Sequence, residues 1–205
     1  MRLRPFALTL AALAAFAALT TAAAVSSEAK TSTTCAVPRG AKVVAASAQA
    51  FAFEVVRDDA DHALYGCLRS GGKRRTLDAW TDCGCSQGDE APPTVWLTGR
   101  VAAISRYDCP PAGAGDPCAG SITSMAISTG RRLRRLDHSA QTLDLVLRRD
   151  GAFAALLGGT VVEPGPSGES VLDPSGAAPG SLALSGDGTT LYWRNGTALR
   201  SATLT

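Results

Sequence analysis

Few residues in this sequence have the types and spacing that catalysis requires. The chain has two histidines, His62 and His138, and the second lies between Asp137 and Ser139. Aspartate, histidine and serine are the residue types of a hydrolase triad, but triad groups meet across a fold and not along consecutive positions. The Gly-x-Ser-x-Gly and His-Glu-x-x-His patterns of common hydrolases are also absent from the sequence. We therefore predict no catalytic residue and no cofactor.

The cysteines indicate disulfide bonds rather than a metal site. An even number of cysteines in an exported chain favours disulfides. A Cys-x-Cys pair resembles half of a thiolate zinc site, but no second pair follows at suitable spacing, so no metal site is predicted. The preferred pairing is Cys35–Cys67 and Cys109–Cys118, with the other two cysteines joined to each other or divided between other partners. The six candidates are Cys35, Cys67, Cys83, Cys85, Cys109 and Cys118.

Basic residues form short clusters at 73–75, 131–132, 134–135 and 148–149. If the first two clusters occupy equivalent hairpins, they form neighbouring positive patches that would contact an anionic wall polymer or lipid head group. Charged edge strands also protect sheets from aggregation, and the net charge of +2 favours this structural explanation. No aromatic residues interleave the clusters, so nucleic acid is not an expected partner. The residues predicted for binding are Arg131, Arg132, Arg134, Arg135 and Trp80, the last expected on a loop over 78–93.

The N-terminus has the features of a secretory signal peptide over residues 1–24. Arg2 and Arg4 precede an apolar run over 6–19, and small residues follow it as a cleavage site. No later apolar run is long enough to cross a bilayer. Residues 25–34 are rich in serine and threonine and are expected to form a disordered lead-in. The remainder, 35–205, has the size of one domain, and we expect it to be secreted or held in the cell envelope.

The elements that would position these residues are short strands. Apolar and polar residues alternate most clearly over 181–204, which is typical of a three-stranded antiparallel meander. Asp187-Gly188 and Asn195-Gly196 are residue pairs that tolerate the backbone angles of tight hairpin turns. Earlier segments repeat the pattern at 42–77, 94–136 and 143–173. The sequence therefore predicts an all-β domain made of about four repeats.

The repeats resemble the blades of a known fold. The stretch Ser128-Thr-Gly-Arg-Arg-Leu-Arg-Arg-Leu136, and its weaker copy over 70–77, resemble the outer hairpin of WD40-like and TolB-like β-propeller blades. Such blades have about 40 residues and four strands. The C-terminal pattern is also similar to that of uncharacterised secreted bacterial proteins. The resemblance implies a small or partial β-propeller of about four degenerate antiparallel blades, and it implies no catalytic residues.

Two features of the architecture stay open at this point. A closed ring would place the strand near Lys42–Ala46 in the last sheet, whereas an open stack would leave unpaired strand edges and favour a homodimer. The same strands would also permit a two-sheet β-sandwich or barrel.

These observations predict a secreted, non-catalytic binding or structural module. Its partner would be an unknown protein or a cell-envelope polymer. The alternative is an extracytoplasmic hydrolase with a site at the mouth of the blades.

Overall fold

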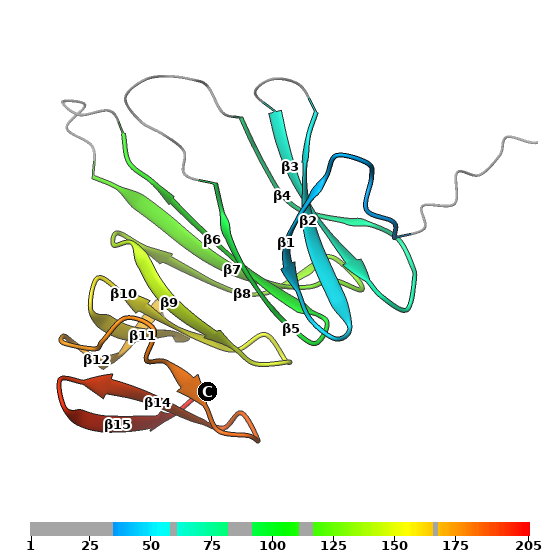
Figure 1. Ribbon diagram of the computed structural model, residues 1–205. Helices are drawn as coiled ribbons and strands as arrows, with labels where there is room; N and C mark the ends of the chain where they lie inside the picture. The colour runs from blue at the N-terminus through cyan, green and yellow to red at the C-terminus, as the bar shows by residue number, and fades with distance from the viewer. Residues whose placement is uncertain (1–34, 58–60, 82–91, 111–116, 166–167) are drawn as a thin grey trace, which may run out of the picture. The chain divides into compact units, whose positions relative to one another are not determined.

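The computed structural model describes residues 35–57, 61–81, 92–110, 117–165 and 168–205, all within one unit that spans Thr33–Thr205. These residues form strands arranged in four antiparallel sheets, and no helix occurs among them (Figure 1). In the described part of the chain, no helix is long and apolar enough to cross a membrane. The predicted signal peptide and lead-in lie outside the described residues.

Strands follow one another in sequence order within each sheet. Sheet 1 consists of β1 (Lys42–Ala46), β2 (Ala50–Val56), β3 (Asp61–Leu68) and β4 (Arg75–Thr81). Sheet 2 consists of β5 (Thr94–Thr98), β6 (Val101–Asp108), β7 (Ala119–Ala126) and β8 (Arg131–His138). Sheet 3 consists of β9 (Thr142–Leu147), β10 (Phe153–Leu157), β11 (Thr160–Gly165) and β12 (Gly168–Asp173). Sheet 4 consists of β13 (Ala183–Leu184), β14 (Thr190–Asn195) and β15 (Ala198–Thr203).

The four predicted repeats correspond to these four sheets, in an arrangement consistent with a partial β-propeller. The structure thus has four sheets, and not the two of a sandwich. β1 does not complete sheet 4, as a closed ring would require, because it pairs with β2 in sheet 1, with Lys42 opposite Glu54. Sheet 4 therefore keeps only its own three strands among the described residues. A local hairpin needs less loop ordering than a distant pairing, which favours the pairing of β1 with β2, its neighbour in the sequence.

The core lies in layers between successive sheets. Side chains alternate along a strand, so an interior sheet contributes to the layers on both of its faces. Phe153 and Leu157 of β10 point into the layer shared with sheet 2, whereas Leu156 points into the layer shared with sheet 4. All five residues of β10 are buried. Each fully buried side chain of this size stabilises the fold by about 1.5–3 kcal/mol, so these layers hold the sheets together.

An extra leucine interrupts the fourth strand of each four-stranded sheet. In sheet 1 the pairing with β3 passes from Asp78 to Thr76 and leaves Leu77 without an opposite residue. Leu133 of β8 and Leu172 of β12 are skipped in the same way. Each of these leucines packs into the layer that its sheet shares with the next sheet. The repeated β-bulge supports the equivalence of the first three sheets.

Sheet 1 also has a buried outer face, where Phe51, Phe53 and Tyr65 form a cluster against which Cys35 packs. The Cys35–Cys67 disulfide fastens the segment before β1 to this cluster, and a second disulfide joins Cys109 to Cys118. Both predicted pairs are therefore present. Cys83 and Cys85 lie outside the described residues.

Candidate functional site

Trp80 does not lie on a loop, as the sequence suggested, but in strand β4. Its ring stacks on the imidazole of His62 with ring centroids 5.1 Å apart, and only 9% of the residue is exposed. His62 in turn lies 2.6 Å from Oε1 of Glu54. This environment makes Trp80 part of the packing of sheet 1, and its role in binding stays a prediction.

The four arginines of the predicted binding set occupy different parts of β8. Arg131 and Arg132 begin the strand and are exposed, beside the β7–β8 turn. Arg134 and Arg135 lie further along, and Arg135 pairs with Asp137 at 2.7 Å, where both groups face solvent. The structure therefore does not gather the four arginines into one patch.

The hairpin of sheet 1 that carries the first basic cluster does lie beside the equivalent hairpin of sheet 2, as predicted. Nη2 of Arg75 donates a hydrogen bond to the carbonyl of Ser128 at 3.2 Å. Other turns at this end also meet across sheets, because the Ser47 hydroxyl donates to the Gly99 carbonyl at 2.8 Å. Since neighbouring strands are antiparallel, the first and third turns of each sheet lie at this same end.

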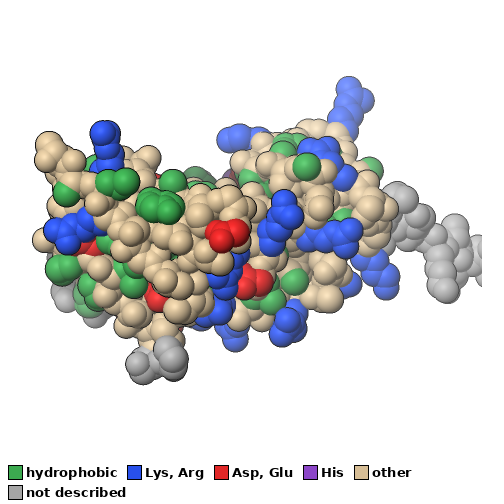
Figure 2. Space-filling model, turned by 90° about the horizontal axis from the view of Figure 1, so that it is seen from below, with side chains coloured by type: hydrophobic (Ala, Val, Ile, Leu, Met, Phe, Trp, Pro, Cys, Tyr) green, Lys and Arg blue, Asp and Glu red, His purple; other side chains and the backbone are tan. Residues whose placement is uncertain are grey.

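Positive charge is concentrated at these turns, which we call the basic end. Figure 2 views the molecule from this side and shows Lys and Arg side chains gathered over the right-hand half, where Figure 1 places sheets 1 and 2. The basic end carries these nine of the chain's twenty cations: Arg69, Lys73, Arg74, Arg75, Arg100, Arg131, Arg132, Arg148 and Arg149. Most of them are exposed, while Arg75 and Arg148 are half-buried.

Two carboxylates occur among the described turn residues of the basic end, and each has a local partner. Arg148 donates to both carboxylate oxygens of Asp150, and these bonds lower the pKa of Asp150 to about 2. Hydrogen bonds from Ser185 and Thr189 lower the pKa of Asp187 to about 2 as well. Asp150 therefore forms an ion pair with Arg148, whereas the other arginines of the basic end have no ion-pair partner among the described residues.

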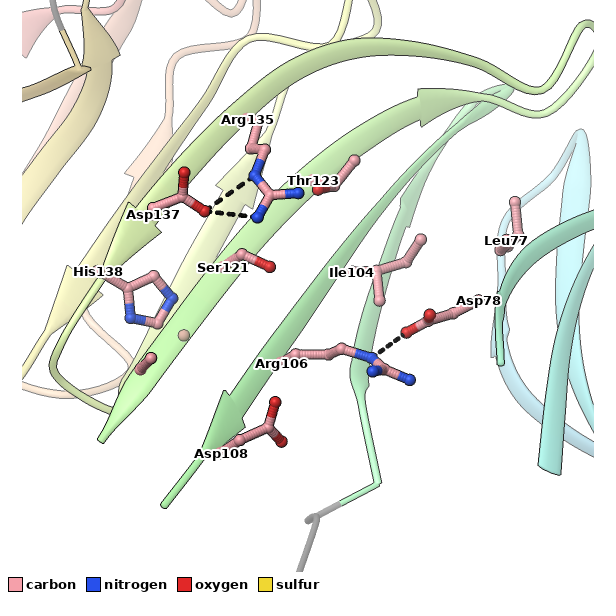
Figure 3. Close-up of a pocket in the computed structure, with 12 residues that line it drawn as sticks. Leu77, Asp78, Ile104, Arg106, Asp108, Ser121, Thr123, Arg135, Asp137 and His138 are labelled. Carbon is pink, nitrogen blue, oxygen red and sulfur yellow. Dashed lines mark hydrogen bonds and ion pairs between the residues drawn. The ribbon is translucent and has the colours of Figure 1, made fainter. Parts of the chain in front are cut away.

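A polar cleft of about 630 Å³ lies between sheets 1 and 2, lined by Asp78 of β4 and by residues of β6, β7 and β8 (Figure 3). Nε of Arg106 lies 2.6 Å from Oδ2 of Asp78, so one ion pair bridges the two sheets. Nη2 of the same arginine donates to the carbonyl of Ala79 at 2.6 Å. Arg106 is thus held on the β4 side of the cleft by two bonds.

Sheet 3 has an aspartate, Asp173, at the position equivalent to Asp78 of sheet 1. Asp78 follows the skipped Leu77 and contacts the second strand of the next sheet. Asp173 follows the skipped Leu172 and accepts a hydrogen bond from Nε1 of Trp193, also on the second strand of the next sheet, at 2.7 Å. The repeat indicates that the Asp78–Arg106 pair is a bridge between sheets. It accounts for two charged residues of the cleft without a catalytic role.

The polar groups that line the cleft also include Asp108, Ser121 and Thr123. Their side chains have no hydrogen-bond or ion-pair partner in the part of the chain that the structure describes. A general acid would need a carboxyl group with a raised pKa. The cleft carboxyl of Asp137 has the opposite property, because its hydrogen bond from Arg135 lowers its pKa. The described residues of the cleft can bind a polar group.

His138 lies at the edge of this cleft and was not predicted as a site residue. Both of its ring nitrogens are buried without a hydrogen-bond partner among the described residues, and the ring stacks on Tyr107. Burial lowers the pKa of His138, while the backbone of Ala140 and the carboxylates of Glu169 and Asp137 act in the opposite direction. No group of three or more His, Cys, Asp or Glu residues within the described ranges could hold a metal ion.

The lowered pKa of His138 predicts a pH-dependent stability. A histidine whose folded pKa is depressed destabilises the fold when it is protonated, so the free energy of unfolding should fall as the pH drops below 6.5. Replacing His138 with Phe keeps a ring beside Tyr107 and removes the titrating group. Urea unfolding between about pH 7.5 and pH 5 should show a smaller loss of stability for His138→Phe than for the wild type. If the free energy of unfolding falls equally with pH in the two proteins, His138 is not the group that causes the loss of stability.

Comparisons with known proteins identify no family. No family model matches the sequence, and no curated protein matches it. A solved structure with some backbone similarity is the bifunctional GH43-CE protein of Bacteroides eggerthii, at 10% sequence identity and a TM-score of 0.30. The match covers 85% of this chain and 25% of that one, so this chain spans a quarter of that protein's length. A similarity this low carries no argument about function.

Proposed function

We propose that this protein is a secreted, non-catalytic binding module whose basic end holds an anionic polymer of the cell envelope. The observation that supports the proposal is the concentration of nine cations on the turns at one end of the sheets. A net charge of +2 argued against an anionic partner as long as the charges were counted over the whole chain. A surface acts through its local potential, so segregated charge binds where the total does not suggest it.

Protection of strand edges does not account for these cations. A charged residue that protects a sheet edge lies on an edge strand, where it opposes pairing with another sheet. Arg131 and Arg132 fit that explanation, since they lie on β8. Arg100 and Arg149 do not, because they lie on turns between paired strands. Their positions are better explained by contact with a partner.

The composition of the basic end favours phosphate groups as the ligand. Eight of its nine cations are arginine. The planar guanidinium binds phosphate oxygens with two parallel hydrogen bonds, whereas lysine acts as a point charge. A polymer with phosphodiester links presents such groups at regular intervals. Export of the chain, predicted from its N-terminus and consistent with its two disulfides, would bring it to polymers of this class.

The alternative is an extracytoplasmic hydrolase, favoured by Asp108, a cleft carboxylate that has no partner among the described residues. That residue is the one to test, because Asp78 and Asp137 are tied to arginines. If the protein shortens the polymer on incubation and Asp108→Asn stops the cleavage, the hydrolase is supported. Binding without cleavage supports the module.

The binding proposal predicts a loss of affinity when Arg131 and Arg132 are both replaced with Gln. Affinity for immobilised linear polyphosphate should fall about tenfold at about 50 mM salt, because two phosphate contacts are lost. The slope of log affinity against log salt concentration should also become shallower by about two, one unit for each lost contact. Biolayer interferometry over a salt series measures both quantities.

A matched control removes the same charge elsewhere. Arg39 and Arg194 are exposed, lie outside the basic end and have no ion-pair partner among the described residues. The double variant Arg39→Gln with Arg194→Gln should keep wild-type affinity within about twofold. Equal losses for the two double variants would show that net charge alone is sensed, and the basic end would then not be a site.

A further inference from the structure

Among the described residues, sheet 4 has three strands where each of the other sheets has four. Its β13–β14 turn lines a shallow cavity with Arg148 of the β9–β10 turn, so β13 and β14 correspond to the first and second strands of sheet 3. β15 therefore takes the place of β3, β7 and β11, each of which has a further strand beside it. Among the described residues, β15 pairs with β14 alone.

The free edge of β15 lacks the features that protect an edge. The fourth strands of the other sheets each carry a bulge, which bends an edge away from pairing. β15 instead pairs with β14 over six consecutive positions without interruption. It contains one charged residue, Arg200, and it is exposed over nearly its whole length. A regular, exposed and nearly uncharged edge is a template for another strand.

The two faces of sheet 4 indicate that another strand would pair along the edge of β15 and that no second sheet would stack on a face of sheet 4. One face is covered by sheet 3, where Leu191 and Trp193 are buried. The other carries Arg194, Ser201 and Thr203 beside Leu199, which is 72% exposed. A sheet stacked on that face would bury a charge and two hydroxyl groups at a cost in desolvation. Pairing along the edge leaves these groups in water and satisfies the unpaired backbone groups of β15.

We propose that β15 pairs with β15 of a second copy of this chain, in antiparallel orientation about a two-fold axis. A two-fold axis perpendicular to the sheet keeps each face continuous, so a residue can only lie opposite one on the same face. One allowed register places Arg200 opposite Arg200 of the second copy, and directly opposed like charges are destabilising. The register centred on Ser201 instead places Arg200 opposite Ala202 and Leu199 opposite Thr203. This register contains no like-charge pair, so β15 is complementary to itself.

The opposite end of the molecule, at sheet 1, favours a dimer over an open-ended assembly. The edge of sheet 1 is the bulged strand β4, and its outer face is covered by the segment that the Cys35–Cys67 disulfide holds. Assembly therefore stops at two copies. Because the pairing is antiparallel, the basic ends of the two copies point in opposite directions. If the proposed function holds, the dimer joins two polymer chains.

A single cysteine at the centre of the pairing tests the register. In Ser201→Cys the two cysteines would face each other with Cα atoms about 4.5–5.5 Å apart, within the range of a disulfide. We expect oxidation to give a covalent dimer on a non-reducing gel. In the control Leu199→Cys, the two cysteines would be offset by about 13 Å along the strands and should not join. Equal yields for the two variants, or no product for either, would overturn the proposed register.

Light scattering after size-exclusion chromatography tests the assembly itself and does not depend on polymer binding. The wild type should have twice the mass of the chain at the top of a concentration series. Ser201→Lys places two like charges at the centre of the pairing and should elute as a monomer that still unfolds in one cooperative transition. A wild type that is monomeric throughout, or a Ser201→Lys dimer, would overturn the proposal. So would a dimer that forms only when residues 25–34 are deleted, since those residues would then be the occupant of the edge.

Discussion

Replacing Asp173 with alanine is expected to lower the free energy of unfolding by about 3–5 kcal/mol. The buried Oδ2 of Asp173 accepts hydrogen bonds from Nε1 of Trp193 at 2.7 Å and from Nδ2 of Asn195 at 2.9 Å. Both donors belong to β14, so this carboxylate fastens sheet 4 to sheet 3. Alanine would leave the buried indole N–H without an acceptor, and that desolvation cost is not recovered.

Urea unfolding near pH 7, followed by tryptophan fluorescence, measures this loss. The comparison is Asp137→Ala, which removes a carboxylate whose side chain is 70% exposed and should cost less than about 1 kcal/mol. If Asp173→Ala costs no more than Asp137→Ala, the carboxylate does not join the sheets.

The pH dependence of the same variant has a defined sign. Hydrogen bonds from Asn195 and Trp193 lower the pKa of Asp173 below its ordinary value of 3.8. A carboxyl group with a depressed folded pKa contributes stability above the unfolded pKa and loses it as the pH falls through the folded pKa. The difference between wild type and Asp173→Ala should therefore narrow as the pH drops below 3.8.

The alternation of apolar and polar residues predicts a strand best where one face is buried and the other is exposed. β14 is an example, because Leu191 and Trp193 are buried while Tyr192 and Arg194 are exposed. The prediction failed at β4 for a physical reason. The extra residue at Leu77 shifts the alternation by one position, so Asp78 and Trp80 no longer continue the pattern that precedes them. The alternation therefore predicts a strand that ends at Leu77 and a loop at Trp80.

The candidate site could also be predicted only in part from the sequence. The basic clusters are visible in the sequence, but their position at one end depends on which turns the antiparallel pairing brings together. Arg100 was not predicted as a binding residue, because it has no basic neighbour in the sequence. The bridge from Asp173 to Trp193 spans 20 positions and has no local pattern, so no reading of short segments would find it. What repeats is the bulged leucine followed by aspartate, at Leu77 and Leu172, and its spacing becomes informative only once the register is known.

Gly151→Ala is expected to cost about 3 kcal/mol or more, from two separate causes. Gly151 has a φ of +96°, a conformation that residues with a side chain rarely adopt. A Cβ there would also lie 2.5 Å from Cδ1 and 2.7 Å from Cβ of the skipped Leu133, so the bulge of β8 fits only against a glycine. Its carbonyl accepts a hydrogen bond from the buried Ser124 hydroxyl, which limits how far the turn can move.

A double-mutant cycle separates the two causes of the Gly151→Ala loss. Gly196→Ala is the control, since Gly196 has a φ of +59° and no atom within 4 Å of an added Cβ, and it should cost about 1 kcal/mol. Combining Gly151→Ala with Leu133→Gly removes every Leu133 atom that the new Cβ would meet but keeps the backbone strain at position 151, so the pair should show a favourable coupling of about 1–2 kcal/mol in urea unfolding. Additive losses of unfolding free energy would mean that the Leu133 side chain can move aside without cost. The bulge would then be a local irregularity and not a contact on which the packing of sheet 2 against sheet 3 depends.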